Sequence, residues 1–189
     1  MESIIIVSGL PRSGTSMMMK ALKSGGVPIL TDNIRKKDQD NPQGYYEFEP
    51  VKKTKQDSSW LKKAQGKAVK MVYRLLYDLP PDYYYQVIFM QRNIKEVLAS
   101  QKEMLKRKEK EPEAEEEMEY LFKKELKKFQ NWINKQNNFK LINVNYAAVI
   151  KDPVKEFKKV KKFLEPGKKI NVLKMAQIVD PDLYRIRKK

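Results

Sequence analysis

The chain has 189 residues, of which 41% are apolar and 10% aromatic, enough for one domain with a sizeable core and too few for two ordinary domains. Forty Lys and Arg against 24 Asp and Glu give a net charge of +16, which suits an anionic ligand but equally serves solubility or a loose attraction to nucleic acid. Cysteine and histidine are both missing, so disulfides, cysteine-based metal sites and histidine bases are excluded, and any general base is Asp, Glu, Lys or Tyr.

The pattern of residues 4–19 predicts a strand, a loop and a helix in that order. The continuous β-branched run at 4–7 predicts a strand buried on both faces, and the loop that follows contains Gly9 and Gly14. Amide groups at a helix N-terminus lack internal partners and carry the positive end of the helix dipole, so they attract anions. Glycines let such a loop wrap closely around a phosphate. The segment therefore predicts a phosphate cradle.

The cradle departs from the Walker pattern G-x-x-x-x-G-K-[ST]. Gly9, Gly14 and Ser16 match it, but Thr15 stands where the lysine belongs, and the basic group is Arg12 inside the loop. A later strand at 87–90 ends in Gln-Arg, whereas kinases and ATPases carry an Asp there that helps to place Mg²⁺. The loop therefore favours phosphate binding without a metal-bridged triphosphate, and no metal is expected.

Residues 31–49 form a long polar stretch without a clear period. Irregular stretches of this length inside a compact domain commonly shape active sites. The stretch carries two carboxylates of interest, Asp32 just beyond a short second strand and Glu47 after a Gly-Tyr-Tyr sequence.

A second phosphate contact is predicted around Arg92. This residue directly follows the strand at 87–90, and Asn93 with Glu96 forms a capping-box-like pair that starts a helix at Ile94. Ser100 lies about two helical turns beyond Asn93, which returns it to the side where Arg92 leaves the strand. One phosphate can therefore contact both Arg92 and Ser100.

The remaining elements complete an alternating pattern of strands and helices. A charged stretch and an amphipathic helix predict a helical insertion at about 102–137, forming either a flap at the mouth of the site or a cover for one sheet face. A further long strand from residue 141, a helix after Asp152, a Pro166-Gly167 turn, a last helix near 172–177 and a solvated basic tail follow. The pattern predicts a single domain, residues 1–189, with three α/β/α layers and a mainly parallel sheet, whose carboxyl edge holds both phosphate contacts.

Three stretches resemble the PAPS-dependent sulfotransferase family, a P-loop-containing nucleotide-binding fold, in the form of a soluble bacterial-type member. Residues 11–16 are similar to its 5′-phosphosulfate-binding loop, and Arg92 and Ser100 have the spacing of its 3′-phosphate ligands. Residues 141–153 and the helix after them resemble a late family segment, although Ala147 and Ala148 replace its acidic pair, so only its structural role is carried over.

The resemblance implies a site for 3′-phosphoadenosine 5′-phosphosulfate (PAPS). In it, Arg12 stabilises charge on the leaving phosphosulfate and a carboxylate takes the acceptor proton, with Glu47 as first choice and Asp32 as second. The alternative is that Asp32 caps a turn and Glu47 is a surface charge. The implied cofactor-binding residues are Pro11, Arg12, Ser13, Gly14, Thr15, Ser16, Arg92 and Ser100.

The function implied is sulfuryl transfer from PAPS to a hydroxyl or amine of a small-molecule or carbohydrate acceptor, with PAP as product. Two alternatives stay open: a nucleotide or small-molecule kinase using the same cradle, and a non-catalytic nucleotide-binding protein, which the missing histidine and the lost acidic pair favour somewhat. The lysines are spread along the chain, so no specific nucleic-acid partner is expected. With no signal-like start and no apolar run near ~18 residues, we expect a soluble cytoplasmic protein without a transmembrane segment.

Overall fold

Five parallel strands form one sheet in the order β2-β3-β1-β4-β5. The computed structural model describes residues 2–32, 34–38, 41, 44–107, 109, 114–164 and 169–184. The strands are β1 (Ile4–Gly9), β2 (Ile29–Leu30), β3 (Ala68–Lys70), β4 (Tyr85–Gln91) and β5 (Phe139–Asn145). Because all neighbours run parallel, their carboxyl ends meet at one edge of the sheet.

Strand β1 lies at the centre of this sheet, between β3 and β4. Its side chains alternate between two cores: Ile4 and Ile6 pack into one, and Ile5 and Val7 into the other. All of its residues are buried, as the β-branched run predicts for a strand covered on both faces.

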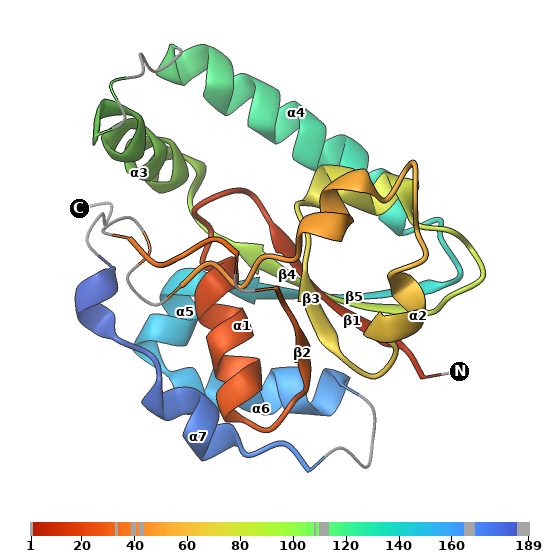
Figure 1. Ribbon diagram of the computed structural model, residues 1–189. Helices are drawn as coiled ribbons and strands as arrows, with labels where there is room; N and C mark the ends of the chain where they lie inside the picture. Colours follow the sequence, from red (N-terminus) through yellow and green to blue (C-terminus); the bar gives the residue numbers. More distant parts are fainter. Residues whose placement is uncertain are drawn as a thin grey trace.

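Four helices cover the face that Ile5 and Val7 meet (Figure 1). They are α1 (Thr15–Ser24), α5 (Tyr146–Lys151), α6 (Pro153–Phe163) and α7 (Val172–Gln177). The starts of the last two follow from local capping, since Asp152 Oδ1 accepts a hydrogen bond from Lys155 N and Asn171 Oδ1 accepts one from Lys174 N. The helices predicted after Asp152 and at 172–177 are confirmed.

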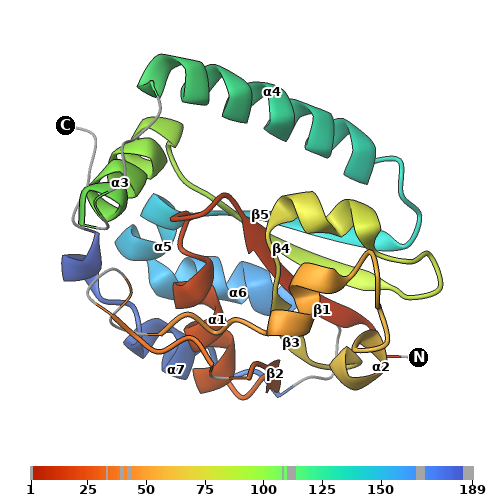
Figure 2. The ribbon, with the colours of Figure 1, turned by 45° about the horizontal axis from the view of Figure 1, so that its top comes forward.

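The opposite face is covered by α4 and by shorter helices, which gives three layers (Figures 1 and 2). These elements are η1 (Glu49–Lys53), α2 (Leu61–Ala64), η2 (Tyr73–Asp78), α3 (Ile94–Arg107) and α4 (Glu115–Ile133). Phe129 of α4 is buried and stacks on Phe89 of β4 with ring centroids 5.2 Å apart. Helix α4 therefore covers the sheet, as in the second alternative for the insertion, whereas Glu103, Met104 and Arg107 of α3, also within it, line the cavity of the site. The α/β/α fold with a parallel sheet is confirmed.

Beyond α7 the chain makes a short 3₁₀ turn, η3 (Pro181–Leu183), and reaches Tyr184. The predicted Pro166-Gly167 turn and the basic tail after Tyr184 lie outside the described residues. Among the residues that are described, no helix combines the length and the hydrophobicity needed to cross a bilayer.

Candidate active site

A cavity of about 630 Å³ lies at the carboxyl edge of the sheet. Its walls come from the segment after β1, from Lys70 and the two residues after it, from Arg92 after β4 and from Tyr146 after β5. After β1 the chain adds β2 and β3 on one side of that strand and then β4 and β5 on the other. Open α/β sheets bind ligands at such a change of side. The fold thus places the predicted cradle at the centre of a ligand-sized site.

The conformation of the loop after β1 requires its two glycines. Gly9 has φ +148° and Gly14 has φ +96°. A Cβ added to Gly14 would lie 2.4 Å from Cδ2 of Tyr146, and one added to Gly9 would lie 2.6 Å from the carbonyl oxygen of Met90. Gly14 is also the N-cap of α1 and has no side chain to cap the first turn, so the amides there keep their capacity for an anion.

Ser13 shapes this loop and is not a wall of the cavity. It is buried, and its Oγ donates to the carbonyl oxygen of Leu10 at 2.7 Å. Among the described residues, the other predicted members of the cradle do line the cavity: Pro11, Arg12, Gly14, Thr15 and Ser16. Any contact of Ser13 with a nucleotide would therefore have to come from its backbone.

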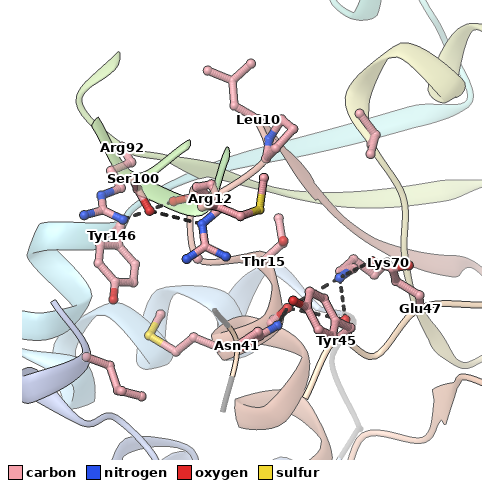
Figure 3. A pocket seen from close by; sticks show the side chains of 18 of the residues that line it. Leu10, Arg12, Thr15, Asn41, Tyr45, Glu47, Lys70, Arg92, Ser100 and Tyr146 are labelled. Atoms are coloured by element: carbon pink, nitrogen blue, oxygen red, sulfur yellow. Dashed lines mark hydrogen bonds and ion pairs between the residues drawn. The ribbon is translucent and has the colours of Figure 1, made fainter. Parts of the chain in front are cut away.

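Hydrogen bonds join the loop to the middle of α3 and to the residue that follows β4. Arg12 Nε donates to Ser100 Oγ at 3.1 Å, and Arg92 Nη1 donates to the carbonyl oxygen of Arg12 at 3.1 Å. Arg92 and Ser100 line the same cavity as Gly14. Figure 3 shows both residues beside Arg12. Two guanidinium groups and a hydroxyl therefore converge at this end, which we call the Arg92 end.

Arg92 is fixed from several directions. Its Nε donates to the buried carboxylate of Glu96 at 3.1 Å, and its guanidinium carbon lies 5.0 Å from the centre of the Tyr146 ring. Asn93 Oδ1 accepts a hydrogen bond from Lys95 N, so the predicted helix start at Ile94 is correct. Glu96, predicted as the second member of that cap, forms an ion pair with Arg92.

The other end of the cavity, which we call the Lys70 end, is built around Lys70 and Glu47, to the right of Thr15 in Figure 3. Lys70 Nζ donates to the carbonyl oxygen of Tyr45 and, at 3.4 Å, to Ser16 Oγ. Glu47 Oε1 lies 2.9 Å from Arg35 Nη1 and 3.6 Å from Lys70 Nζ. A carboxylate and two cations thus stand beside the first turn of α1.

Lys70 is a site residue that the sequence analysis missed. Burial lowers the pKa of its ammonium group from 10.5 to about 8; the neighbouring cations Arg35 and Arg12 act in the same direction, and Glu47 opposes them. A lysine shifted in this way within a cleft is a functional candidate. The sequence signal that could have identified Lys70 is its place directly after the apolar pair Ala68 and Val69. In the structure this pair belongs to β3, which lies beside β1, and Lys70 ends that strand at its carboxyl end.

Asp32 lies away from the cavity walls formed by the described residues. Its Oδ1 accepts a hydrogen bond from Ile34 N at 3.0 Å, and its Oδ2 accepts one from Glu49 N at 2.6 Å. The carboxylate therefore caps a turn and the start of η1, as in the alternative given for it. Of the two predicted bases, the structure brings only Glu47 to the cavity.

A solved structure with a similar fold is a sulfotransferase domain. "Sulfotransferase Domain from the Curacin Biosynthetic Pathway" is similar with a TM-score of 0.54 and 16% identity, covering 93% of this chain and 83% of that one. A sulfotransferase from Alicyclobacillus acidocaldarius has a TM-score of 0.49 and 15% identity, covering 97% of this chain and 88% of that one. No curated protein sequence matches the chain. The family profile described as "Sulfotransferase domain" matches residues 2–180, so the chain belongs to the sulfotransferase family.

Proposed function

We propose that the protein transfers a sulfuryl group from PAPS to a hydroxyl or amine of a small-molecule or carbohydrate acceptor. The observation that carries the proposal is that Gly14, Arg92 and Ser100 line one cavity. A single adenosine with a 5′-phosphosulfate and a 3′-phosphate can then be bound at both phosphates. The α1 amides and Thr15 would hold the 5′-phosphate, and Arg92 with Ser100 the 3′-phosphate.

In the reaction, the acceptor oxygen or nitrogen forms a bond to sulfur while the bond from sulfur to the bridging oxygen of the 5′-phosphate breaks. The acceptor proton passes to Glu47, the carboxylate at the Lys70 end. Lys70 stands beside Ser16 and stabilises the negative charge that develops on the leaving phosphate. Arg12, in the same loop as Gly14 and Thr15, adds a second positive charge near that phosphate.

A calorimetric titration with 3′,5′-adenosine diphosphate, ADP and 5′-AMP tests the binding part of the proposal. We expect the 3′,5′ compound to bind at least tenfold more tightly than the others, because charge-assisted hydrogen bonds to its 3′-phosphate contribute about 1.5–3 kcal/mol. Arg92→Ala should remove this preference. Arg74→Ala is the matched control, since Arg74 contacts Tyr73 and does not line the cavity. Equal binding of the three compounds by the unmodified protein would refute the assignment of Arg92 and Ser100.

Turnover separates the proposal from its two rivals. A kinase that bridges its triphosphate with Mg²⁺ loses activity in a chelator, whereas transfer of labelled sulfate by this loop should continue. A non-catalytic binder would show the nucleotide preference without any transfer to hydroxyl or amine acceptors. The assay therefore uses PAPS with labelled sulfate, a panel of small acceptors, and chelator in half of the samples.

A further inference from the structure

The last described residues return to the nucleotide site. After α7 the chain passes through η3 and arrives beside α3, at the left of the sheet in Figures 1 and 2. Leu183 lines the cavity, and Tyr184 is half-buried next to it. In this C-terminal segment, residues 178–184, Tyr184 contacts Glu96, which lies 88 positions earlier in the chain.

Tyr184 contacts the residue that holds Arg92. Its hydroxyl donates to the carboxylate of Glu96 and lies 2.9 Å from Oε1 and 2.8 Å from Oε2. The same Oε2 accepts from Arg92 Nε at 3.1 Å, and the Glu96 and Arg92 side chains are only 7% and 9% exposed. Tyr184, Glu96 and Arg92 therefore form a continuous chain of hydrogen bonds.

The rings of Tyr184 and Tyr146 flank the same guanidinium group. Its central carbon lies 5.1 Å from the centre of the Tyr184 ring and 5.0 Å from that of Tyr146. The two rings are 5.2 Å apart and nearly perpendicular, at 89°. A guanidinium group is planar and directional, so contacts with two rings and one carboxylate fix the direction in which its N–H groups point.

We propose that Tyr184 is a positioning residue that sets the selectivity of the site for a 3′-phosphate, acting on Arg92 through Glu96. The inference rests on the proposed function, in which Arg92 binds that phosphate. The hydroxyl of Tyr184 engages the Glu96 carboxylate, while Arg92 presents Nε to Glu96 and directs Nη1 toward the cradle. Without the hydroxyl, the buried carboxylate loses a donor and turns further onto Arg92, where it competes with the phosphate.

The test is the ratio of two dissociation constants, for 5′-AMP and for 3′,5′-adenosine diphosphate, measured by calorimetry. Tyr184→Phe keeps the ring and removes only the hydroxyl. We expect it to lower the ratio by about threefold to tenfold, the effect of one ordinary hydrogen bond, because Tyr184 acts on the phosphate only indirectly, with the affinity for 5′-AMP unchanged. Tyr84→Phe makes the same chemical change at a side chain that is 65% exposed and distant from the cavity, and it should leave the ratio unchanged.

A double-mutant cycle gives the second readout. In an Arg92→Ala background the 3′-phosphate has lost its proposed ligand, so Tyr184→Phe should change the ratio no further. An unchanged ratio in Tyr184→Phe, or an equal loss of affinity for both nucleotides, would overturn the inference and leave the proposed function standing. If the unmodified protein binds both nucleotides equally, the proposed function itself fails, and the inference fails with it.

Discussion

Glu47 and Asp32 lie in the same irregular segment but in different chemical settings. Glu47 faces the cavity beside Lys70 and Arg35, whereas both carboxylate oxygens of Asp32 accept backbone N–H groups. A proton acceptor must reach the acceptor group of the substrate, and of these two carboxylates Glu47 is the one that lines the cavity. A capping carboxylate, in contrast, contributes to stability.

We therefore predict opposite effects for the two conservative substitutions. Glu47→Gln should lower kcat by about 10²- to 10⁴-fold with little change in the affinity for 3′,5′-adenosine diphosphate. Asp32→Asn should keep kcat within a factor of about two and lower the free energy of unfolding by on the order of 1 kcal/mol. Steady-state kinetics and urea unfolding of both variants measure this, and the reverse pattern would assign the base to Asp32.

Lys70 carries a cost in stability that depends on pH. Its pKa is about 8 in the folded protein against the ordinary 10.5 of a lysine in the unfolded chain, so keeping the ammonium form at pH 7 costs on the order of 3 kcal/mol. Between pH 8 and 10.5 the unfolded chain binds more protons than the folded one, and stability therefore rises with pH in that window. Below pH 8 the full cost is present.

Lys70→Met should accordingly stabilise the protein and inactivate it. We expect the free energy of unfolding at pH 7 to rise by roughly 2–3 kcal/mol, a gain that shrinks as the pH passes from 8 to 10.5, while kcat falls about 10²-fold or more. Urea unfolding at pH 7 and pH 10 measures the first effect. Lys127→Met, at an exposed position on α4, is the control and should show no such pH-dependent gain.

At the scale of elements, the loop between β1 and α1 depends on how closely Tyr146 approaches it. Gly14 and Gly26 have similar backbone angles, φ +96° and +93°. A Cβ at Gly14 meets Tyr146 at 2.4 Å, whereas the nearest atom to one at Gly26 is 3.7 Å away. The two positions therefore share the backbone strain, and only Gly14 adds a steric clash.

We predict that Gly26→Ala lowers stability by about 1 kcal/mol and leaves nucleotide binding unchanged. Gly14→Ala should cost clearly more stability and reduce the affinity for 3′,5′-adenosine diphosphate by at least about tenfold, because the loop or Tyr146 must move. Thermal unfolding and calorimetry distinguish the two contributions. Equal effects of both substitutions would show that contact with Tyr146 is unimportant.

Several helices and strands were predictable from the sequence alone. The start of α3 at Ile94 and the helix near 172–177 were predictable because they depend on caps and apolar periods within a few residues. The central, doubly buried β1 was predictable for the same reason. The residues that decide these features lie close together in the sequence.

Contacts between distant segments were not predictable from the sequence. Lys70 ends a strand of three residues, and its setting comes from Glu47 and Tyr45 in an irregular segment. Tyr184 is 88 positions from Glu96, and no periodicity links them. The sequence ranked Glu47 above Asp32 as the base, but the capping role of Asp32 became clear only from its hydrogen-bond partners.

At the scale of the whole molecule, the net charge of +16 acts on every anionic ligand. Salt screens such fields over about 10 Å at 0.1 M. We therefore predict that the affinity for 3′,5′-adenosine diphosphate falls by about tenfold between 50 and 500 mM KCl. Titrations with uncharged adenosine are the control and should change little. A nucleotide affinity that is insensitive to salt would show that short-range contacts alone determine binding.

The central position of β1 also has a consequence for synthesis on the ribosome. This strand is translated before its partners, yet Ile5 pairs with Ala68 on one side and Ile4 with Tyr85 on the other. The loop after β1 is therefore synthesised before the strands that hold its conformation. Until they follow, both edges of the apolar strand β1 are unpaired, which favours aggregation or chaperone binding. Tyr184 forms its hydrogen bond with Glu96 across 88 positions of the chain. We therefore expect selective nucleotide binding to appear only after residues 178–184 have been synthesised.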